Sequence, residues 1–241
     1  GTNDDWETEG NDRLSLALPG DQDELISKVL EANPNTIVVN NSGSPISMPW
    51  LADAPAVIQT WFAGQEFGCA LADILLGEVN PSGKLPITFP ASLEDTPAFT
   101  NYPGEFGKVH YGEGLYVGYR WYSSRSIQPL FCFGHGLSYT SFEYSAGSIV
   151  EQNVDGSVTI EFDLQNSGER LGKETVQVYL QALQSVVAKP KLQLACFTKV
   201  SLQPGEKRRL RLVLEAESFA HWDVEKGNWQ REAAAYLIHV A

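Results

Sequence analysis

Hydrophobic positions in the first 90 residues follow two different periods. Residues 21–31 (DQDELISKVLE) place four apolar side chains at helical spacing, with acidic residues in the first turn, and predict a helix. A second helical pattern covers 65–76 and ends before Gly77, a residue typical of a helix C-cap. Short apolar runs at 36–40 (TIVVN) and 57–62 (VIQTWF) are typical of buried parallel strands. This alternation predicts a layered α/β unit with parallel strands.

The regular periodicity then fades. Residues 91–142 are rich in Gly, Pro and aromatic side chains and carry no sustained period of either kind. A structureless stretch of this length is unusual inside a compact domain. We therefore expect it to act as a connector that wraps over other parts of a larger protein.

The last part of the chain, 143–241, shows strict alternation of apolar and polar residues. Turn signals separate the alternating runs, as at Asn166–Gly168 (NSG) and Pro204–Gly205. The apolar positions of these runs are Val158, Ile160, Phe162 and Leu164, then Val176, Val178 and Leu180, then Leu210, Leu212 and Leu214, and finally Tyr236, Ile238 and Val240. Period-two runs at short spacing predict an antiparallel, immunoglobulin-like β-sandwich. The predicted fold class is therefore α/β plus all-β.

Composition excludes partners more than it selects them. The formal net charge of −13 argues against nucleic acid and anionic membranes, since phosphate binding needs clustered Lys and Arg. No apolar run approaches the roughly 18 residues that span a bilayer, and the polar, acidic start of the chain is unlike a signal peptide. Cys69, Cys132 and Cys196 are too few and too widely spaced for a disulfide framework or a zinc site. The four histidines show no metal-ligand spacing, so we expect no metal and no cofactor.

Three further patterns are better explained by structure than by chemistry. The scattered glycines of 112–118 lack the strand–turn–helix context of a dinucleotide loop. The serines of 41–45 lack the nucleophile elbow of a serine hydrolase. Glu66 lies in the first turn of a predicted helix, where stabilisation by the helix dipole explains it.

The charged loop Glu7–Arg13 (ETEGNDR) is the remaining candidate site. A carboxyl group there could act as a general acid/base; alternatively, this is an exposed acidic loop beside an Asp12–Arg13 ion pair. Glu7 and Glu9 would point to the same side of an extended segment. Among reactions that use two carboxyl groups, glycoside hydrolysis is one example, and it needs them to flank the scissile bond, about 5–5.5 Å apart for retention or 6.5–9.5 Å for inversion. We therefore expect the partner carboxylate to lie elsewhere.

Four motifs in a fixed order carry a family resemblance. They are Glu7–Arg13, Gly77–Pro86 (GEVNPSGKLP), Tyr111–Tyr122 (YGEGLYVGYRWY) and Phe133–Thr140 (FGHGLSYT). Together they resemble glycoside hydrolase family 3, the β-glucosidase family. Asn166–Gly168 with Gly172–Tyr179 (GKETVQVY) is similar to the fibronectin type III-like module of that family.

The resemblance implies a domain layout. Family members usually carry an N-terminal (β/α)8 barrel, then an α/β sandwich domain, then the fibronectin-like module. We therefore expect 1–90 to be the C-terminal portion of the α/β sandwich domain, 91–142 the wrapping connector and 143–241 the fibronectin type III-like domain. The barrel would be missing, so the chain would be the C-terminal portion of a longer enzyme and inactive by itself.

The resemblance also implies a reaction and site residues. The whole enzyme would be a retaining β-glucosidase that releases terminal non-reducing β-D-glucosyl residues, with the nucleophilic Asp supplied by the barrel. Glu9 would be the acid/base, a role that requires a pKa raised towards about 6. Trp6 and Asn11 are the candidate substrate-binding residues. Asn11 stands where the family often has an aromatic residue, so a stacking surface near the leaving group is expected to be missing.

Other interpretations stay open at this point. The chain could be a non-catalytic carbohydrate-binding or scaffolding module in which Glu9 is only a solvated acid. It could also belong to a β-xylosidase of the same family, because sugar specificity lies largely in the barrel. The compartment is open too: the family's polysaccharide-degrading role favours secretion, whereas a free thiol favours the cytoplasm.

Overall fold

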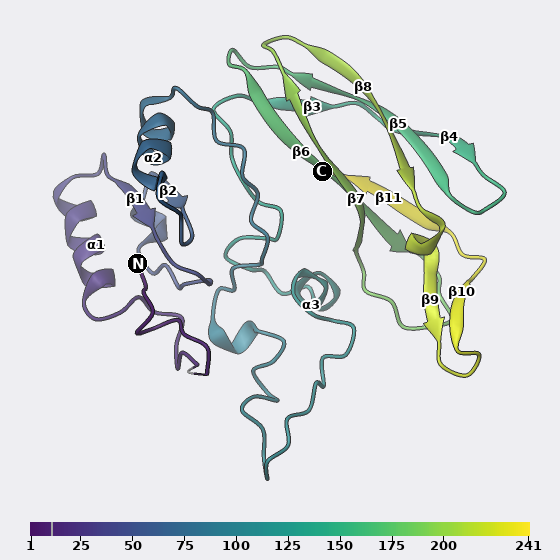
Figure 1. The fold of residues 1–241 in the computed structure, drawn as a ribbon, viewed down its shortest axis with the longest axis horizontal. Helices are drawn as coiled ribbons and strands as arrows, with labels where there is room; N and C mark the ends of the chain where they lie inside the picture. The colour runs from purple at the N-terminus through teal and green to yellow at the C-terminus, as the bar shows by residue number, and fades with distance from the viewer. Residues whose placement is uncertain (11) are drawn as a thin grey trace.

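The computed structural model describes residues 1–10 and 12–241 as an α/β unit, an irregular connector and a β-sandwich (Figure 1). The α-helices are α1 (Gln22–Ala32), α2 (Phe67–Leu76) and α3 (Tyr119–Arg125). Short 3-10 turns are Leu51–Asp53, Leu93–Asp95 and Ala216–Phe219. The strands are β1 (Ile37–Asn40), β2 (Ala56–Gln59), β3 (Phe142–Tyr144), β4 (Ser148–Gln152), β5 (Val158–Asn166), β6 (Gly172–Ala182), β7 (Gln193–Leu202), β8 (Lys207–Leu214), β9 (Ala220–Asp223), β10 (Asn228–Arg231) and β11 (Tyr236–Val240).

The α/β unit is built on a two-stranded parallel sheet. β1 pairs with β2 in the register Val38↔Val57, as the two apolar runs predict. The indole of Trp50 donates a hydrogen bond of 2.7 Å to Asp23 in the first turn of α1, which ties this helix to the segment after β1. The buried cluster beneath the sheet consists of Leu18, Leu30, Val38, Ile46, Met48, Trp50 and Phe89.

Much of the apolar surface of this unit is left uncovered by the described residues. Of the apolar face predicted for the first helix, only Leu30 is fully buried, whereas Leu25 is 62% exposed. The strand predicted as buried is buried on one side only, because Ile37 and Val39 lie on the opposite side from Val38 and remain exposed. The sequence pattern thus places the elements correctly but predicts more burial than two strands and their helices provide.

Helix α2 ends as its sequence predicts. Gly77 adopts the left-handed conformation with φ +77°, and its N–H bonds the carbonyl of Ile74. Glycine suits this position since a side chain would strain the left-handed backbone.

The connector is more ordered than its sequence indicates. It contains α3, which the sequence prediction missed because seven residues are too few to establish a helical period. Trp121 on this helix donates a hydrogen bond to the carbonyl of Asp95, and Tyr122 is buried. Phe89 and Phe131 form an isolated antiparallel bridge, which joins the α/β unit to the end of the connector.

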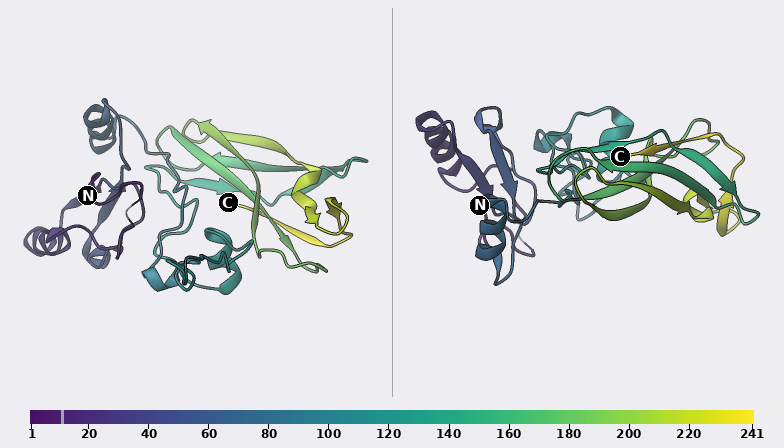
Figure 2. Two further views of the ribbon diagram at one scale, coloured as in Figure 1. Left: turned by 60° about the horizontal axis from the view of Figure 1, so that its bottom comes forward. Right: turned by 90° about the horizontal axis from the view of Figure 1, so that it is seen from above.

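Two antiparallel sheets form the sandwich. In one sheet β3 and β4 pair in succession along one edge of β5, and β8 pairs with the other edge; the second sheet has the order β11-β6-β7. The predicted alternating positions face inward, and the most deeply buried are Leu164, Val176, Val178, Leu180, Leu202 and Leu214. Figure 2 shows the sandwich and the α/β unit at opposite ends of the molecule. Both predicted fold classes are therefore present.

Two general observations complete the fold. In the part of the chain that the structure describes, no helix is long and apolar enough to cross a membrane. The domain boundaries at 90/91 and 142/143 remain predictions.

Candidate functional site

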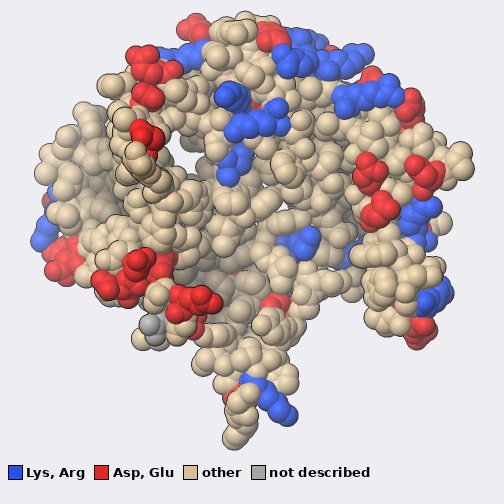
Figure 3. Space-filling model, in the orientation of Figure 1, with Lys and Arg blue, Asp and Glu red and all other residues tan. Residues whose placement is uncertain are grey.

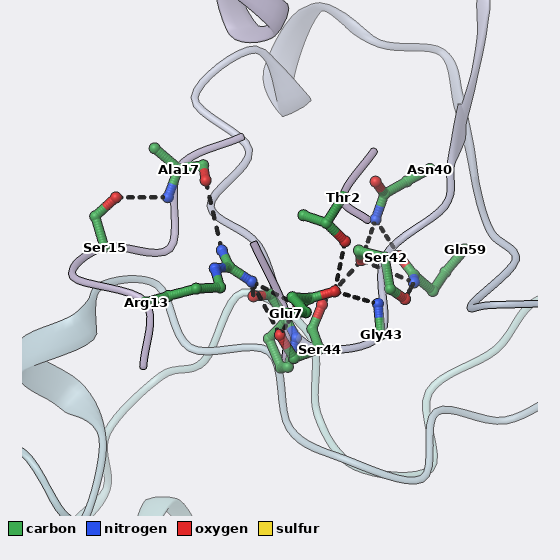
Figure 4. A network of polar contacts seen from close by, with 11 residues as sticks. Thr2, Glu7, Arg13, Ser15, Ala17, Asn40, Ser42, Gly43, Ser44 and Gln59 are labelled. Carbon is green, nitrogen blue, oxygen red and sulfur yellow. Dashed lines mark hydrogen bonds and ion pairs between the residues drawn. The ribbon is translucent and has the colours of Figure 1, made fainter. Parts of the chain in front are cut away.

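Glu7 is the centre of a polar network that joins three segments (Figure 4). Its Oε2 accepts hydrogen bonds from the hydroxyl of Thr2 and, at 2.6 Å, from the N–H of Gly43. Its Oε1 accepts from the hydroxyl of Ser44 and, at 2.9 Å, from the guanidinium of Arg13. Both oxygens of the carboxylate are thereby used, and the side chain is only 10% exposed.

Arg13 pairs with Glu7 and not with Asp12, so the predicted Asp12–Arg13 pair is wrong. The Arg13 guanidinium turns inward, where Nη1 also donates to the hydroxyl of Ser44 at 2.9 Å and to the carbonyl of Pro45 at 3.3 Å. Asp12 instead accepts a hydrogen bond from the Tyr102 hydroxyl. The reason is tertiary: the loop after β1 supplies inward-facing acceptors that a neighbouring Asp cannot replace.

The network keeps Glu7 ionised. Burial alone would raise the pKa of this carboxyl group, but hydrogen bonds from Ser44, Thr2, Gly43 and Arg13 outweigh it and hold the pKa below its usual value. Glu7 is therefore a poor proton donor near neutral pH.

Glu9 lies in a different environment from Glu7. Its side chain is exposed, and no hydrogen bond or ion pair joins its carboxylate to another described residue. The backbone turns at residues 9 and 10, with Gly10 at φ +87°. The segment is therefore not extended beyond Thr8, which forms an isolated bridge, and it turns directly at Glu9.

Of the two candidate substrate-binding residues, the structure describes Trp6. Trp6 lies directly before the network and is 49% exposed, so its ring is accessible beside the loop. Asn11 lies outside the residues that the structure describes.

A second polar cluster supports the loop after β1. Asn40, at the end of β1, donates a hydrogen bond of 2.9 Å to the hydroxyl of Ser42. Ser42 donates to the carbonyl of Ser44, and Gln59 on β2 donates to the carbonyl of Ser42. The serines that lack a nucleophile elbow thus have a structural role here. The sequence signal for this cluster was an Asn at the end of the predicted strand 36–40, followed by small polar residues.

The charged side chains on one face of the molecule are partly segregated by sign (Figure 3). Figure 3 shows Lys and Arg side chains gathered over the upper part of the sandwich and acidic side chains on the lower edge of the α/β unit. The basic side chains on β8 are neutralised by neighbouring acids, as where Arg209 and Lys207 both contact Asp163 at 2.9 Å. Among residues 1–10 and 12–241, no group of three or more His, Cys, Asp or Glu side chains could hold a metal ion.

Family models place both halves of this fold. Residues 1–139 match the model of the glycosyl hydrolase family 3 C-terminal domain, and residues 174–241 match that of a fibronectin type III-like domain. The α/β unit and the sandwich therefore define the C-terminal architecture of a glycoside hydrolase, and the chain belongs to glycosyl hydrolase family 3.

Individual relatives agree with this assignment. A β-glucosidase from Kluyveromyces marxianus is 45% identical over 242 residues, covering 100% of this chain and 28% of the relative. Thermostable β-glucosidase B from Acetivibrio thermocellus is 43% identical over 99% of this chain and 32% of its own length. The crystal structure of the K. marxianus β-glucosidase in complex with glucose superposes with a TM-score of 0.93, at 45% identity, over 99% of this chain and 28% of that structure. The chain thus spans about a third or less of the relatives it matches.

Proposed function

We propose that this chain is the acid/base-bearing part of a retaining β-glucosidase that releases terminal non-reducing β-D-glucosyl residues. The observation that carries the proposal is Glu9, an exposed carboxylate on a loop whose two ends are fixed by the Glu7–Arg13 pair. Family membership and the β-glucosidase names of the relatives support the reaction class.

In the proposed reaction Glu9 acts twice. Its protonated carboxyl group first donates a proton to the glycosidic oxygen as the leaving group departs from the anomeric carbon. An Asp from an N-terminal barrel domain, in the same or a separate chain, forms the glycosyl ester. The Glu9 carboxylate then takes a proton from the water that hydrolyses this ester. Trp6 and Asn11 are proposed to contact the substrate beside Glu9.

The test uses the complete reading frame that encodes this chain, assayed on an aryl β-glucoside. Glu9→Gly should lower turnover by about 10²- to 10⁴-fold, the usual contribution of a general acid/base. Azide should restore activity and yield a β-glucosyl azide, since a small anion can attack the glycosyl-enzyme without a general base. Asp4→Asn, which alters another exposed acid of the same segment, serves as the matched control and should keep full activity.

Two other outcomes would redirect the assignment. Unchanged turnover in Glu9→Gly would make the chain a non-catalytic carbohydrate-binding or scaffolding module. Faster hydrolysis of the aryl β-xyloside than of the glucoside would keep the acid/base role but change the sugar.

A further inference from the structure

The Glu7 carboxylate is turned towards the protein, where both of its oxygens accept hydrogen bonds. Its four hydrogen-bond donors come from the start of the chain, from the loop after β1 and from Arg13. Glu7 and Arg13 are 10% and 13% exposed, so most of this pair is withdrawn from water. A buried ion pair seldom stabilises a fold more than apolar residues of the same size would. What such a pair does define is geometry.

The geometry that it defines is that of the loop carrying Glu9. Glu7 and Arg13 are the two ends of the heptad, and their contact of 2.9 Å brings these two ends together. Ser44 belongs to both ends, because its hydroxyl donates to Glu7 and accepts from Arg13. Both ends of the loop are therefore held to one point beyond β1.

We propose that Glu7 and Arg13 are positioning residues, which hold the backbone of the loop so that the Glu9 carboxyl group meets the glycosidic oxygen. This inference rests on the proposed function of Glu9. Neither residue exchanges a proton with the substrate, and each acts only through the placement of Glu9. Displacing a catalytic group by about 1 Å can cost about 10²-fold in rate, so the loop must be fixed at its ends.

The experiment compares two substrates in the complete enzyme. Phenyl β-glucoside has a poor leaving group, which must be protonated by an acid as it departs. The 2,4-dinitrophenolate of the dinitrophenyl β-glucoside departs without such protonation. Glu7→Gln retains the size of the side chain but removes its charge. It should lower kcat/KM by about 10- to 100-fold on the phenyl substrate, a fraction of what a general acid contributes, and by less than about 2-fold on the dinitrophenyl substrate.

A matched control separates positioning from general destabilisation. Glu174→Gln removes the charge of another 2.9 Å ion pair, with Lys84, at the contact between the α/β unit and the sandwich. It should change kcat/KM on the two substrates by the same factor. Arg13→Lys keeps the positive charge but not the guanidinium geometry, and its substrate ratio should lie between those of the wild type and Glu7→Gln. Arg13→Lys also tests the inference if Glu7→Gln does not fold.

Equal losses on the two substrates in both Glu7→Gln and Arg13→Lys would overturn the inference. Glu9→Gly with azide, run in parallel, distinguishes the two possible failures. If azide rescues that variant while the substrate ratios stay flat, only the positioning role is wrong. If Glu9→Gly loses no activity, the proposed acid/base itself is wrong.

Discussion

The Lys84 ammonium lies 2.9 Å from the carboxylate of Glu174 and joins the end of the α/β unit to strand β6 of the sandwich. The same ammonium donates a hydrogen bond of 2.9 Å to the carbonyl of Gly136. The pair is 21% and 9% exposed, in contrast to the pair of Lys28 with Glu24 on α1, which is 69% and 62% exposed. The same two parts of the chain are also joined by hydrogen bonds from Arg170 to the carbonyl of Gly77 and from Lys199 to the carbonyl of Ser82.

Lys84→Met should destabilise the chain more than Lys28→Met does. Removing Lys84 leaves the charge of Glu174 in a largely buried place, which costs about 3 kcal/mol. Lys28 loses only a solvated pair on one helix face, worth about 0.5 kcal/mol or less. Urea unfolding followed by circular dichroism measures both. Equal midpoints for the two variants would contradict the expected importance of the interdomain contact.

Asn166→Ala should destabilise the sandwich by about 3 kcal/mol, because it leaves several buried polar groups without partners. The Asn166 side chain is fully buried and donates to the carbonyls of Arg170 and Leu202 while accepting from Gly168 and Thr140. The control is Gln203→Ala, an exposed amide side chain in the same domain, which should change stability by about 0.5 kcal/mol or less. A small effect of Asn166→Ala in calorimetry would mean that water replaces these bonds.

Glu7→Gln should reduce the loss of stability that the protein shows on acidification. Hydrogen bonds hold the pKa of Glu7 below its usual value against the opposing effect of burial. A carboxyl group whose pKa is lowered by folding stabilises the protein above its unfolded pKa of about 4.3, and this contribution disappears as the pH falls through the folded value. The difference in Tm between wild type and variant should therefore be largest at neutral pH and shrink below about pH 4. A difference that grows on acidification would contradict this sign.

Two of the three thiols should react quickly with a disulfide reagent at pH 8. Cys69 and Cys132 are exposed, whereas Cys196 lies half-buried on β7 and its burial raises the pKa of the thiol. A thiol of raised pKa supplies less of the reactive thiolate. Absorbance of the released chromophore should show two fast equivalents and a third that appears only on unfolding. Three equal rates would show that Cys196 is more accessible than the structure indicates.

Hydrophobic periodicity in the sequence predicted the elements in which apolar positions recur regularly over several residues. The runs that became β5, β8 and β11 alternate because one face of each packs in the sandwich core, whereas β6 keeps an alternating sequence but is buried on both faces from Val176 to Leu180. Shorter or less regular elements escaped: β7 and the hairpin β9–β10 mix apolar and polar residues on both faces. These segments are strands because they form hydrogen bonds with their pairing partners, and their own sequence patterns do not reveal this.

For the candidate site, the sequence determined the motif and the tertiary structure decided its contacts. The sequence itself contains the heptad with its glycine and the order of the other motifs. These suffice to indicate the family and to make Glu9 the candidate acid/base, which stays a proposal. The sequence does not reveal the partner of Arg13. Asp12 is adjacent in sequence, whereas Glu7 and Ser44 meet Arg13 only after β1 and its loop have folded. A buried ion pair forms where the fold both withdraws the two charged groups from water and places them in hydrogen-bonding geometry. Both conditions are properties of the folded chain.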